Sequence, residues 1–237
     1  MATRCETSYR ERLTEFLDPR EQEIIQSIIG NDDEVTIAFF GGSPYSERKR
    51  ALIAPSYIEV DEGDFKLSLY EIRYPVKFVS LEHRDVLGAL MNLGLKREKF
   101  GDIIMCKEHV QVIIAEEIEE YVRANLQMIG KATVSIAPLA LSKLEKKQDV
   151  WIESTTTVSS LRLDAVMSQI FNLSRTKVRP YIEKGLVKVN FKLVDQPALL
   201  LVEGDQLSVR GFGRTKLIEI EGKTKKDKYR LRFGQLS

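Results

Sequence analysis

The residue types best suited to chemistry gather in one stretch, LSRTKVRPYIEKGLVKVN, at residues 173–190. A serine able to cap a helix is followed by arginines and lysines, a glycine stop and a short alternating strand. Helical spacing places Val178, Tyr181 and Ile182 on one face, which must turn toward a core. The cations share the opposite face, where like charges one turn apart repel by about 0.2–0.5 kcal/mol. Phosphate groups would neutralise this repulsion, so the chemistry indicated is polyanion binding.

Neighbouring groups can extend this cationic face. Arg175, Arg179 and Lys184 point away from the expected core. The free amides at the helix start, between residues 174 and 177, add an anion site through the helix dipole. Further positive charge is available from Arg162 at the start of the preceding helix and from Lys188 and Lys192 in the following hairpin.

The net charge of +1 conceals a division along the chain. Residues 157–237 hold 16 Lys and Arg against 8 Asp and Glu, whereas residues 1–156 hold 20 against 27. A basic C-terminal third behind an acidic body favours contact between that third and a polyanion. The count alone is equally consistent with a chance excess of charge on a solvated surface.

Length and composition limit the class of protein. A chain of 237 residues, 43% hydrophobic and 30% charged, can bury cores for two or three domains. No run approaches about 18 apolar residues and no secretory signal is evident, so we expect a cytoplasmic protein without membrane contact. Cys5 and Cys106 have no CxxC spacing, so we expect two reduced thiols, no disulfide framework and no metal site.

We expect three domains, at residues 1–62, 63–145 and 155–237, and the last of them carries the cationic stretch. The first is a small α/β unit. Its helix begins after Asp18 with a proline at the first position and ends near Gly30. Strands are predicted at residues 35–40 and 51–54, joined through a glycine pair that we interpret as a turn.

The middle domain follows the order β-α-β-β-α-β. Its strands are predicted at 65–74, 101–106, 110–115 and 131–138, and its helices at 83–94 and 116–127. This order is that of ferredoxin-like domains, which include the common RNA recognition domain. Such RNA recognition domains stack bases on aromatic side chains of the inner strands. The strand VQVIIA at 110–115 has none, so base stacking on this sheet is disfavoured.

The last domain is expected to begin after a polar linker at residues 139–156. Apolar residues recur at helical spacing in its first helix, at Leu163, Val166, Met167, Ile170 and Phe171. Ser174 caps a second helix, with Leu173 and Val178 as a hydrophobic staple. Alternating strands follow, so the domain is two helices on a small antiparallel sheet. The fold class predicted for the whole chain is α+β.

The C-terminal motifs resemble the S-four RNA-binding domain, named for the fourth small-subunit ribosomal protein. The matching motifs are RLD at 162–164, SRTK at 174–177, I-x-x-G-x-V-x-V-N at 182–190 and GDQLSVR at 204–210. In that family the two helices and the hairpin grip folded RNA. The resemblance implies RNA contacts at Arg162, Ser174, Arg175, Lys177, Arg179 and Lys188. With the cationic face described above, we predict that Thr176, Lys184, Asn190 and Lys192 also take part.

Two residues depart from the family pattern. Phe191 follows the hairpin asparagine where the family usually has glycine, so the turn must differ in type or carry strain. Pro180 lies inside the second helix, where it removes a backbone hydrogen bond and is expected to kink the helix.

The front of the chain narrows the resemblance to YlmH-type proteins of bacteria and related organelles. The similar stretches are FLDPREQEI, FFGGSPYSERKRALIAP and LEHRDVLGALMNLGLKREKFGDI, together with the later RGFGR and EGKTKK. This resemblance implies a noncatalytic RNA-binding protein on the ribosome, with ribosomal RNA and tRNA as partners, the large subunit as the site and rescue of stalled translation as the role. A link to cell division is also attached to the family. We expect a monomer without cofactor or small-molecule substrate.

A second basic group lies in the front half of the chain. The triplet HRD at 83–85 has no kinase context, because Leu90 stands where a kinase has asparagine and no glycine-rich phosphate loop is present. A structural role is the leading interpretation of His83. A possible second RNA patch nevertheless comprises Arg48, Lys49, Arg50, His83, Arg84, Lys96, Arg97 and Lys99.

Three other classes of protein compete with this interpretation. A pseudouridine synthase would carry a large catalytic domain after the RNA-gripping domain, and only short hairpins remain there. A methyltransferase would show a glycine-rich loop after a strand, and we find none. In a cell-division adaptor, the acidic front would bind protein and the basic third would be incidental.

Overall fold

The computed structural model describes residues 11–30, 33–146 and 150–236. The chain divides into two compact units, residues 1–147 and 148–237, each with a hydrophobic core of its own. Cys106 is a free thiol, as predicted, whereas Cys5 lies outside the described residues. The described parts contain no helix long and apolar enough to cross a membrane.

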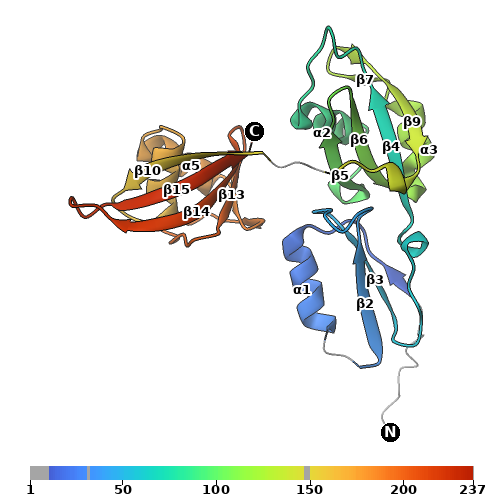
Figure 1. Ribbon diagram of the computed structural model, residues 1–237, viewed down its shortest axis with the longest axis horizontal. Coiled ribbons are helices and arrows are strands. Elements are labelled where there is room, and N and C mark those ends of the chain that lie inside the picture. Colours follow the sequence, from blue (N-terminus) through green and yellow to red (C-terminus); the bar gives the residue numbers. More distant parts are fainter. Residues whose placement is uncertain (1–10, 31–32, 147–149, 237) are drawn as a thin grey trace. The chain divides into compact units, whose positions relative to one another are not determined.

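The first part of unit 1 is a helix beside a three-stranded antiparallel sheet of order β1-β3-β2 (Figure 1). Helix α1 (Pro19–Ile29) begins as the sequence predicts. Asp18 Oδ1 accepts a hydrogen bond from the Glu21 amide at 3.0 Å, and the Glu21 carboxylate accepts one from the Asp18 amide at 2.7 Å. The strands are β1 (Arg12–Leu13), β2 (Val35–Phe40) and β3 (Arg50–Pro55).

The second part of unit 1 is the ferredoxin-like arrangement that the sequence predicts. Its main sheet is antiparallel with the order β5-β6-β4-β9, and α2 and α3 lie together on one face of it (Figure 1). The strands are β4 (Leu67–Arg73), β5 (Phe100–Met105), β6 (His109–Ala115) and β9 (Ser135–Leu139). The helices are α2 (His83–Asn92) and α3 (Glu119–Asn125). Short elements complete it: η1 (Glu62–Phe65), η2 (Arg97–Lys99), η3 (Glu116–Ile118), η4 (Leu141–Lys143) and the hairpin β7 (Met128–Ile129) and β8 (Ala132–Thr133).

The face of this sheet opposite the helices is covered by the chain itself. The segment after β9 runs back over it, and Leu141 and Leu144 pack against the core. Gln111, only 2% exposed, holds the segment from β6. Its side-chain amide donates to the Lys143 carbonyl at 3.1 Å, and its oxygen accepts from the Glu145 amide at 2.8 Å. This cover agrees with the prediction that bases do not stack on the sheet, because that face is occupied.

The two parts of unit 1 are joined by buried polar contacts. The Asp102 carboxylate on β5, 6% exposed, accepts hydrogen bonds from the backbone amides of Glu47 and Arg48 at 2.7 and 3.0 Å. The glycine pair before that loop is a turn, as predicted. Gly42 has φ +94°, which favours glycine, and a Cβ on Gly41 would lie 2.2 Å from the Arg48 carbonyl oxygen, where the backbone approaches too closely for a side chain.

Unit 2 is two helices on a six-stranded antiparallel sheet of order β10-β15-β14-β13-β11-β12. The helices are α4 (Leu163–Ile170) and α5 (Arg175–Glu183). The strands are β10 (Trp151–Val158), β11 (Val187–Val189), β12 (Lys192–Leu193), β13 (Gln206–Val209), β14 (Gly213–Lys223) and β15 (Tyr229–Leu236). The α+β class and the two-helix architecture are confirmed. The sequence predicted a small antiparallel sheet, and the observed sheet has six strands.

The expected linker at residues 139–156 is too long. Strand β10 begins at Trp151 and pairs with β15 along its whole length, from Trp151 opposite Leu236 to Val158 opposite Tyr229. The expected domain start at residue 155 therefore falls inside a strand. The polar residues of β10 misled the prediction, because an outer strand with one solvated face is polar at many positions.

The hairpin between β11 and β12 resolves the question raised by Phe191. Asn190 and Phe191 form the two-residue loop with φ +47° and +63°, so both occupy the left-handed region that a type I′ turn requires. The turn type is therefore kept and Phe191 carries strain, on the order of 1 kcal/mol. The Arg214 guanidinium lies 5.7 Å from the centre of the Phe191 ring, a contact that offsets part of the strain.

Helix α5 begins at the predicted cap. Ser174 Oγ accepts a hydrogen bond from the Lys177 amide at 3.3 Å. Val178 and Ile182 are fully buried, and the Tyr181 ring packs edge-on against Phe212 with centroids 5.5 Å apart. The predicted core face of the helix is thus correct, and the helix remains continuous through Pro180.

Replacing Gln111 with alanine removes both hydrogen bonds that hold the segment after β9 on the sheet. We expect the free energy of unfolding of unit 1 to fall by about 1–2 kcal/mol. Hydrogen exchange at residues 141–145 should accelerate. Gln169, exposed on α4 in unit 2, provides the control, because its replacement with alanine should leave exchange at 141–145 unchanged. Unchanged exchange in the Gln111 variant would show that apolar packing alone holds the cover.

Candidate nucleic-acid interface

Three of the predicted cationic side chains converge on one buried carboxylate where α4 meets α5. Arg162 precedes α4, and its Nε lies 3.2 Å from Asp164 Oδ1. From α5, Arg175 Nη2 lies 2.7 Å from Asp164 Oδ2, and Arg179 Nε lies 3.8 Å from the same oxygen. The spacing of one helical turn places Arg175 and Arg179 on the same side of α5. This group of three arginines around Asp164 is called the arginine cluster below.

The carboxylate of Asp164 is held ionised although it is buried. Its side chain has no exposed surface. Burial by itself would raise the pKa of Asp164, but the hydrogen bonds from Arg162 and Arg175 outweigh that effect and hold the pKa below its ordinary value. A depressed carboxylate pKa stabilises the fold at neutral pH, and this contribution is lost as the pH falls through the folded-state pKa.

The sequence did not predict that these arginines, expected to point away from the core, would share a buried carboxylate. Each guanidinium turns one edge toward Asp164, because a buried carboxylate must be paired. The side chains of Arg162, Arg175 and Arg179 nevertheless remain 37%, 46% and 53% exposed. Three positive charges around one negative charge leave two uncompensated. The cluster can therefore bind an anion at its exposed edge while Asp164 fixes its geometry.

The start of α5 lies next to this cluster and carries the remaining predicted contacts of the helix. The Ser174 hydroxyl lies 2.8 Å from the Thr176 hydroxyl. The first backbone amides of a helix have no acceptor within it, so this end favours an anion. Lys177 is exposed on the first turn, and Lys184 is exposed at the C-terminal cap.

The hairpin cations lie elsewhere on unit 2. Val187 and Val189 point into the core, so strand alternation directs Lys188 to the opposite face of the sheet from the helices. There it lines a shallow groove with Arg210 and Arg214. Arg210 and Arg214 were not among the predicted contacts. Both arginines belong to the stretch RGFGR, which the sequence analysis used only for the resemblance to YlmH-type proteins.

The side chain of Asn190 has a structural function. Its amide nitrogen donates to Asp205 Oδ1 at 2.8 Å, and its oxygen accepts from the Gln206 amide at 2.9 Å. These bonds fix the β11–β12 hairpin to the start of β13, and the predicted RNA contact of Asn190 remains a prediction. Lys192 is exposed just beyond the turn.

The structure also corrects the possible second patch for Arg48 and Arg50. Arg48 donates from Nε to the Phe100 carbonyl at 3.1 Å and from Nη2 to the Phe16 carbonyl at 2.6 Å. Arg50, 5% exposed, donates to the Thr14 carbonyl at 2.7 Å. Both guanidinium groups satisfy buried backbone oxygens, and this internal role withdraws them from the surface.

The other members of that patch are mostly paired within unit 1. Arg97 donates to the Phe100 and Gly101 carbonyls. Lys99 bridges the carboxylates of Glu15 and Glu117. Arg84 and Lys96 each lie beside a glutamate on the surface, and their side chains are 76% and 80% exposed. Lys49 donates to the Pro44 carbonyl at 3.4 Å, and His83 begins α2.

Family models match three consecutive stretches of the chain. Residues 1–58 match the model described as YlmH, N-terminal. Residues 61–143 match the putative RNA-binding domain in YlmH, and residues 161–207 match the S4 domain. The last stretch contains the arginine cluster and the β11–β12 hairpin.

Two known proteins are similar to the chain over much of its length. The ribosome-associated protein quality control protein P2 of Bacillus subtilis (strain 168) is 50% identical over 226 residues, which are 95% of this chain and 87% of that protein. A solved structure, the cell division protein ylmH from Streptococcus pneumoniae, is 31% identical with a TM-score of 0.51. That match covers 59% of this chain and 86% of the other.

Replacing Asp164 with asparagine removes the charge that orders the arginine cluster. Three guanidinium groups then face one another without a carboxylate. We expect the free energy of unfolding of unit 2 to fall by about 1–3 kcal/mol, as measured by thermal unfolding. The loss should shrink as the pH falls toward the pKa of Asp164, because the wild-type carboxyl is then also neutral. Equal stability of both proteins at neutral pH would show that the three contacts contribute nothing.

Proposed function

The chain belongs to the YlmH family, and we propose that it binds structured RNA on the ribosome through the arginine cluster of unit 2. The preferred partners are ribosomal RNA and tRNA on the large subunit. The role that best fits them is rescue of stalled translation, since the relative in Bacillus subtilis is named for ribosome-associated quality control. A monomeric cytoplasmic protein is consistent with this role.

The observation that carries the proposal is the excess positive charge of the arginine cluster. Arg175 is hydrogen-bonded to Asp164 and Arg179 lies 3.8 Å from the same oxygen, yet both side chains are about half exposed. Arginine held in this way loses little further side-chain freedom when it meets a phosphate. The amides at the start of α5 offer a second anion-binding group beside it. A folded RNA presents several phosphates at once, so it can use both groups.

A binding role without catalysis fits the domain content. The matched models for residues 61–143 and 161–207 are described as an RNA-binding domain and an S4 domain. We therefore propose that the chain recognises RNA and leaves it chemically unchanged.

A cell-division adaptor is the second candidate function. The structural relative in Streptococcus pneumoniae is named a cell division protein, and residues 1–156 hold 27 acidic against 20 basic residues. An excess of acidic residues of this kind suits a basic protein partner. Tighter binding to purified division proteins than to ribosomal RNA at the same ionic strength would favour the adaptor.

The salt dependence of RNA binding tests the proposed contacts. With about five phosphates neutralised, log K should fall against log salt concentration with a slope of roughly −3.5 to −4.5. Replacing Arg175 and Arg179 with glutamine should flatten the slope by about 1.4–1.8 and weaken binding about tenfold or more. Fluorescence anisotropy with a ribosomal RNA fragment measures both quantities.

The matched control replaces two exposed lysines of unit 1, Lys77 and Lys131, with glutamine. The control removes the same formal charge but leaves the arginine cluster intact, so it should keep the wild-type slope. Equal flattening in both variants would mean that net charge alone governs binding and that the cluster is not the contact.

Removal of unit 2 tests the ribosome partner. A chain that ends at residue 147, ahead of β10, should no longer sediment with ribosomal particles at physiological salt, whereas the full chain should. A chain that ends at residue 154 would keep the first half of β10 but lack β15, the strand with which β10 pairs. The cut at residue 147 avoids this unpaired half-strand and is the better test. If the shortened chain still sedimented fully with the particles, unit 1 would be the part that binds the ribosome.

A further inference from the structure

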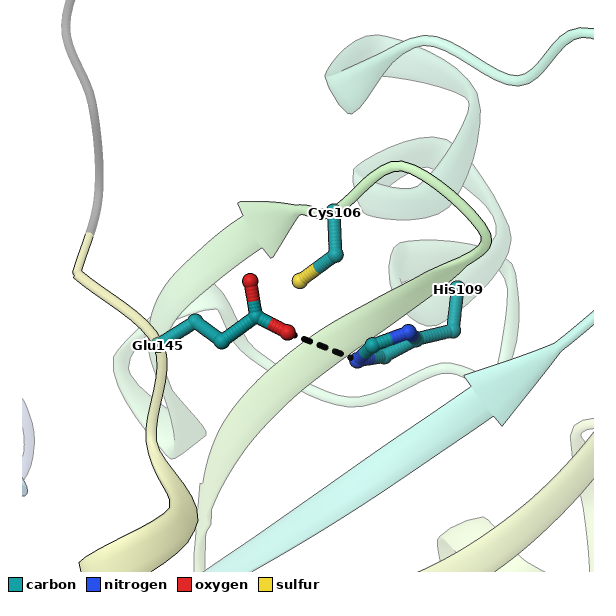
Figure 2. A group of neighbouring side chains, drawn as sticks. All are labelled: Cys106, His109 and Glu145. Carbon is teal, nitrogen blue, oxygen red and sulfur yellow. Dashed lines mark ion pairs between the residues drawn. The ribbon is translucent and has the colours of Figure 1, made fainter.

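Three potential metal ligands meet in unit 1, where the β5–β6 connection lies beside the segment after β9. Cys106, His109 and Glu145 each offer one donor atom, and the three atoms lie within 4.8 Å of one another. Figure 2 shows the sulfur, the imidazole ring and the carboxylate turned toward a common point. His109 Nε2 lies 3.3 Å from Glu145 Oε1. Because Glu145 is distant in the sequence, the spacing of Cys106 and His109 alone gave no indication of a site.

The backbone holds each ligand in place. Cys106 and His109 flank the tight connection between β5 and β6, where the Cys106 amide donates to the His109 carbonyl at 3.0 Å. Glu145 belongs to the segment that covers the sheet, and its amide donates to the Gln111 side chain at 2.8 Å. Two ligands from a hairpin and one from an anchored segment make a preorganised group, in contrast to a chance meeting of flexible side chains.

All three side chains are at least partly reachable from solvent. His109 is 22% exposed and Glu145 is 52% exposed, and Cys106 is partly buried. Burial, together with the neighbouring Glu145 carboxylate, raises the pKa of the Cys106 thiol to about 12. Without an ion the thiol is therefore neutral. A divalent cation between the donors reverses the local electrostatics, because it favours the thiolate that the carboxylate opposes.

We propose that Cys106, His109 and Glu145 form a binding site for a divalent transition-metal ion, with Zn²⁺ as the best fit. Sulfur, imidazole nitrogen and carboxylate oxygen are the three donor types that zinc accepts in tetrahedral sites. Hard cations such as Mg²⁺ and Ca²⁺ prefer oxygen alone. The three donors leave a fourth position for water. On binding, the Cys106 thiol releases its proton to solvent and the sulfur bonds to the ion.

The bound ion would join the β5–β6 hairpin to the segment after β9. That segment covers the face of the sheet opposite the helices and is the last described part of unit 1, which ends at residue 147. The ion adds a third attachment to the contacts of Gln111 and to the packing of Leu144. Bound there, the ion would stabilise the C-terminal end of unit 1 by cross-linking the hairpin to this segment.

Metal titration of the full chain tests this proposal without reference to RNA. Isothermal titration of metal-free protein with Zn²⁺ should show one site. Co²⁺ should produce a near-ultraviolet charge-transfer band typical of a cobalt–thiolate bond. Replacing Cys106 with serine should abolish that band and weaken Zn²⁺ binding by about 10–100-fold. Hydrogen exchange at residues 143–146 should slow when Zn²⁺ is added to the wild-type protein.

Matched variants separate this site from general metal binding. Replacing Glu145 with glutamine changes an exposed side chain and should weaken Zn²⁺ binding in a folded protein, even if the Cys106 variant misfolds. Replacing Cys5 with serine and His83 with asparagine removes the other cysteine and the other histidine, and should leave binding unchanged. The proposal is overturned if the wild-type protein binds no Zn²⁺, or if the Glu145 variant binds it as tightly.

Discussion

The pairing of one buried carboxylate with several arginines is the interaction on which the proposed function depends. Asp164 has no solvent contact, so it must be paired, and the available partners are the guanidinium groups of Arg162, Arg175 and Arg179. The same pairing orders side chains that would otherwise repel one another. Because three cations surround one anion, the surplus positive charge remains at the surface. One arrangement thus both pairs the buried carboxylate and leaves positive charge at the surface.

Positive charge is used differently in the two units. In unit 1, Arg48 and Arg50 satisfy backbone carbonyls and Lys99 bridges two glutamates. These cations stabilise the chain internally. In unit 2, the arginine cluster and the groove of Lys188, Arg210 and Arg214 keep positive charge exposed on different sides of the domain. These cations of unit 1 are thus internal, whereas the two groups of unit 2 present positive charge at the surface.

Residue patterns predicted most of the fold. The Asp18 and Ser174 caps, the core face of α5 and the β-α-β-β-α-β order follow from local rules that act within a few residues. The prediction was less successful where distant residues meet. Strand β10 is polar and was interpreted as linker, because its partner β15 lies at the other end of the domain. Asp164 was present in the quoted RLD motif, but its burial and its three partners depend on how α4 packs against α5. The Arg48–Lys49–Arg50 run resembles a solvated patch until the carbonyls it satisfies are known.

The most direct measurement is an electron cryomicroscopy map of the full chain bound to the ribosomal particle with which it sediments. The central claim predicts RNA phosphate oxygens within hydrogen-bonding distance of Arg175 and Arg179, with Asp164 still paired on their inner side. A map in which RNA contacts unit 2 only through the opposite sheet face, or in which the protein meets the particle through unit 1 alone, would contradict it.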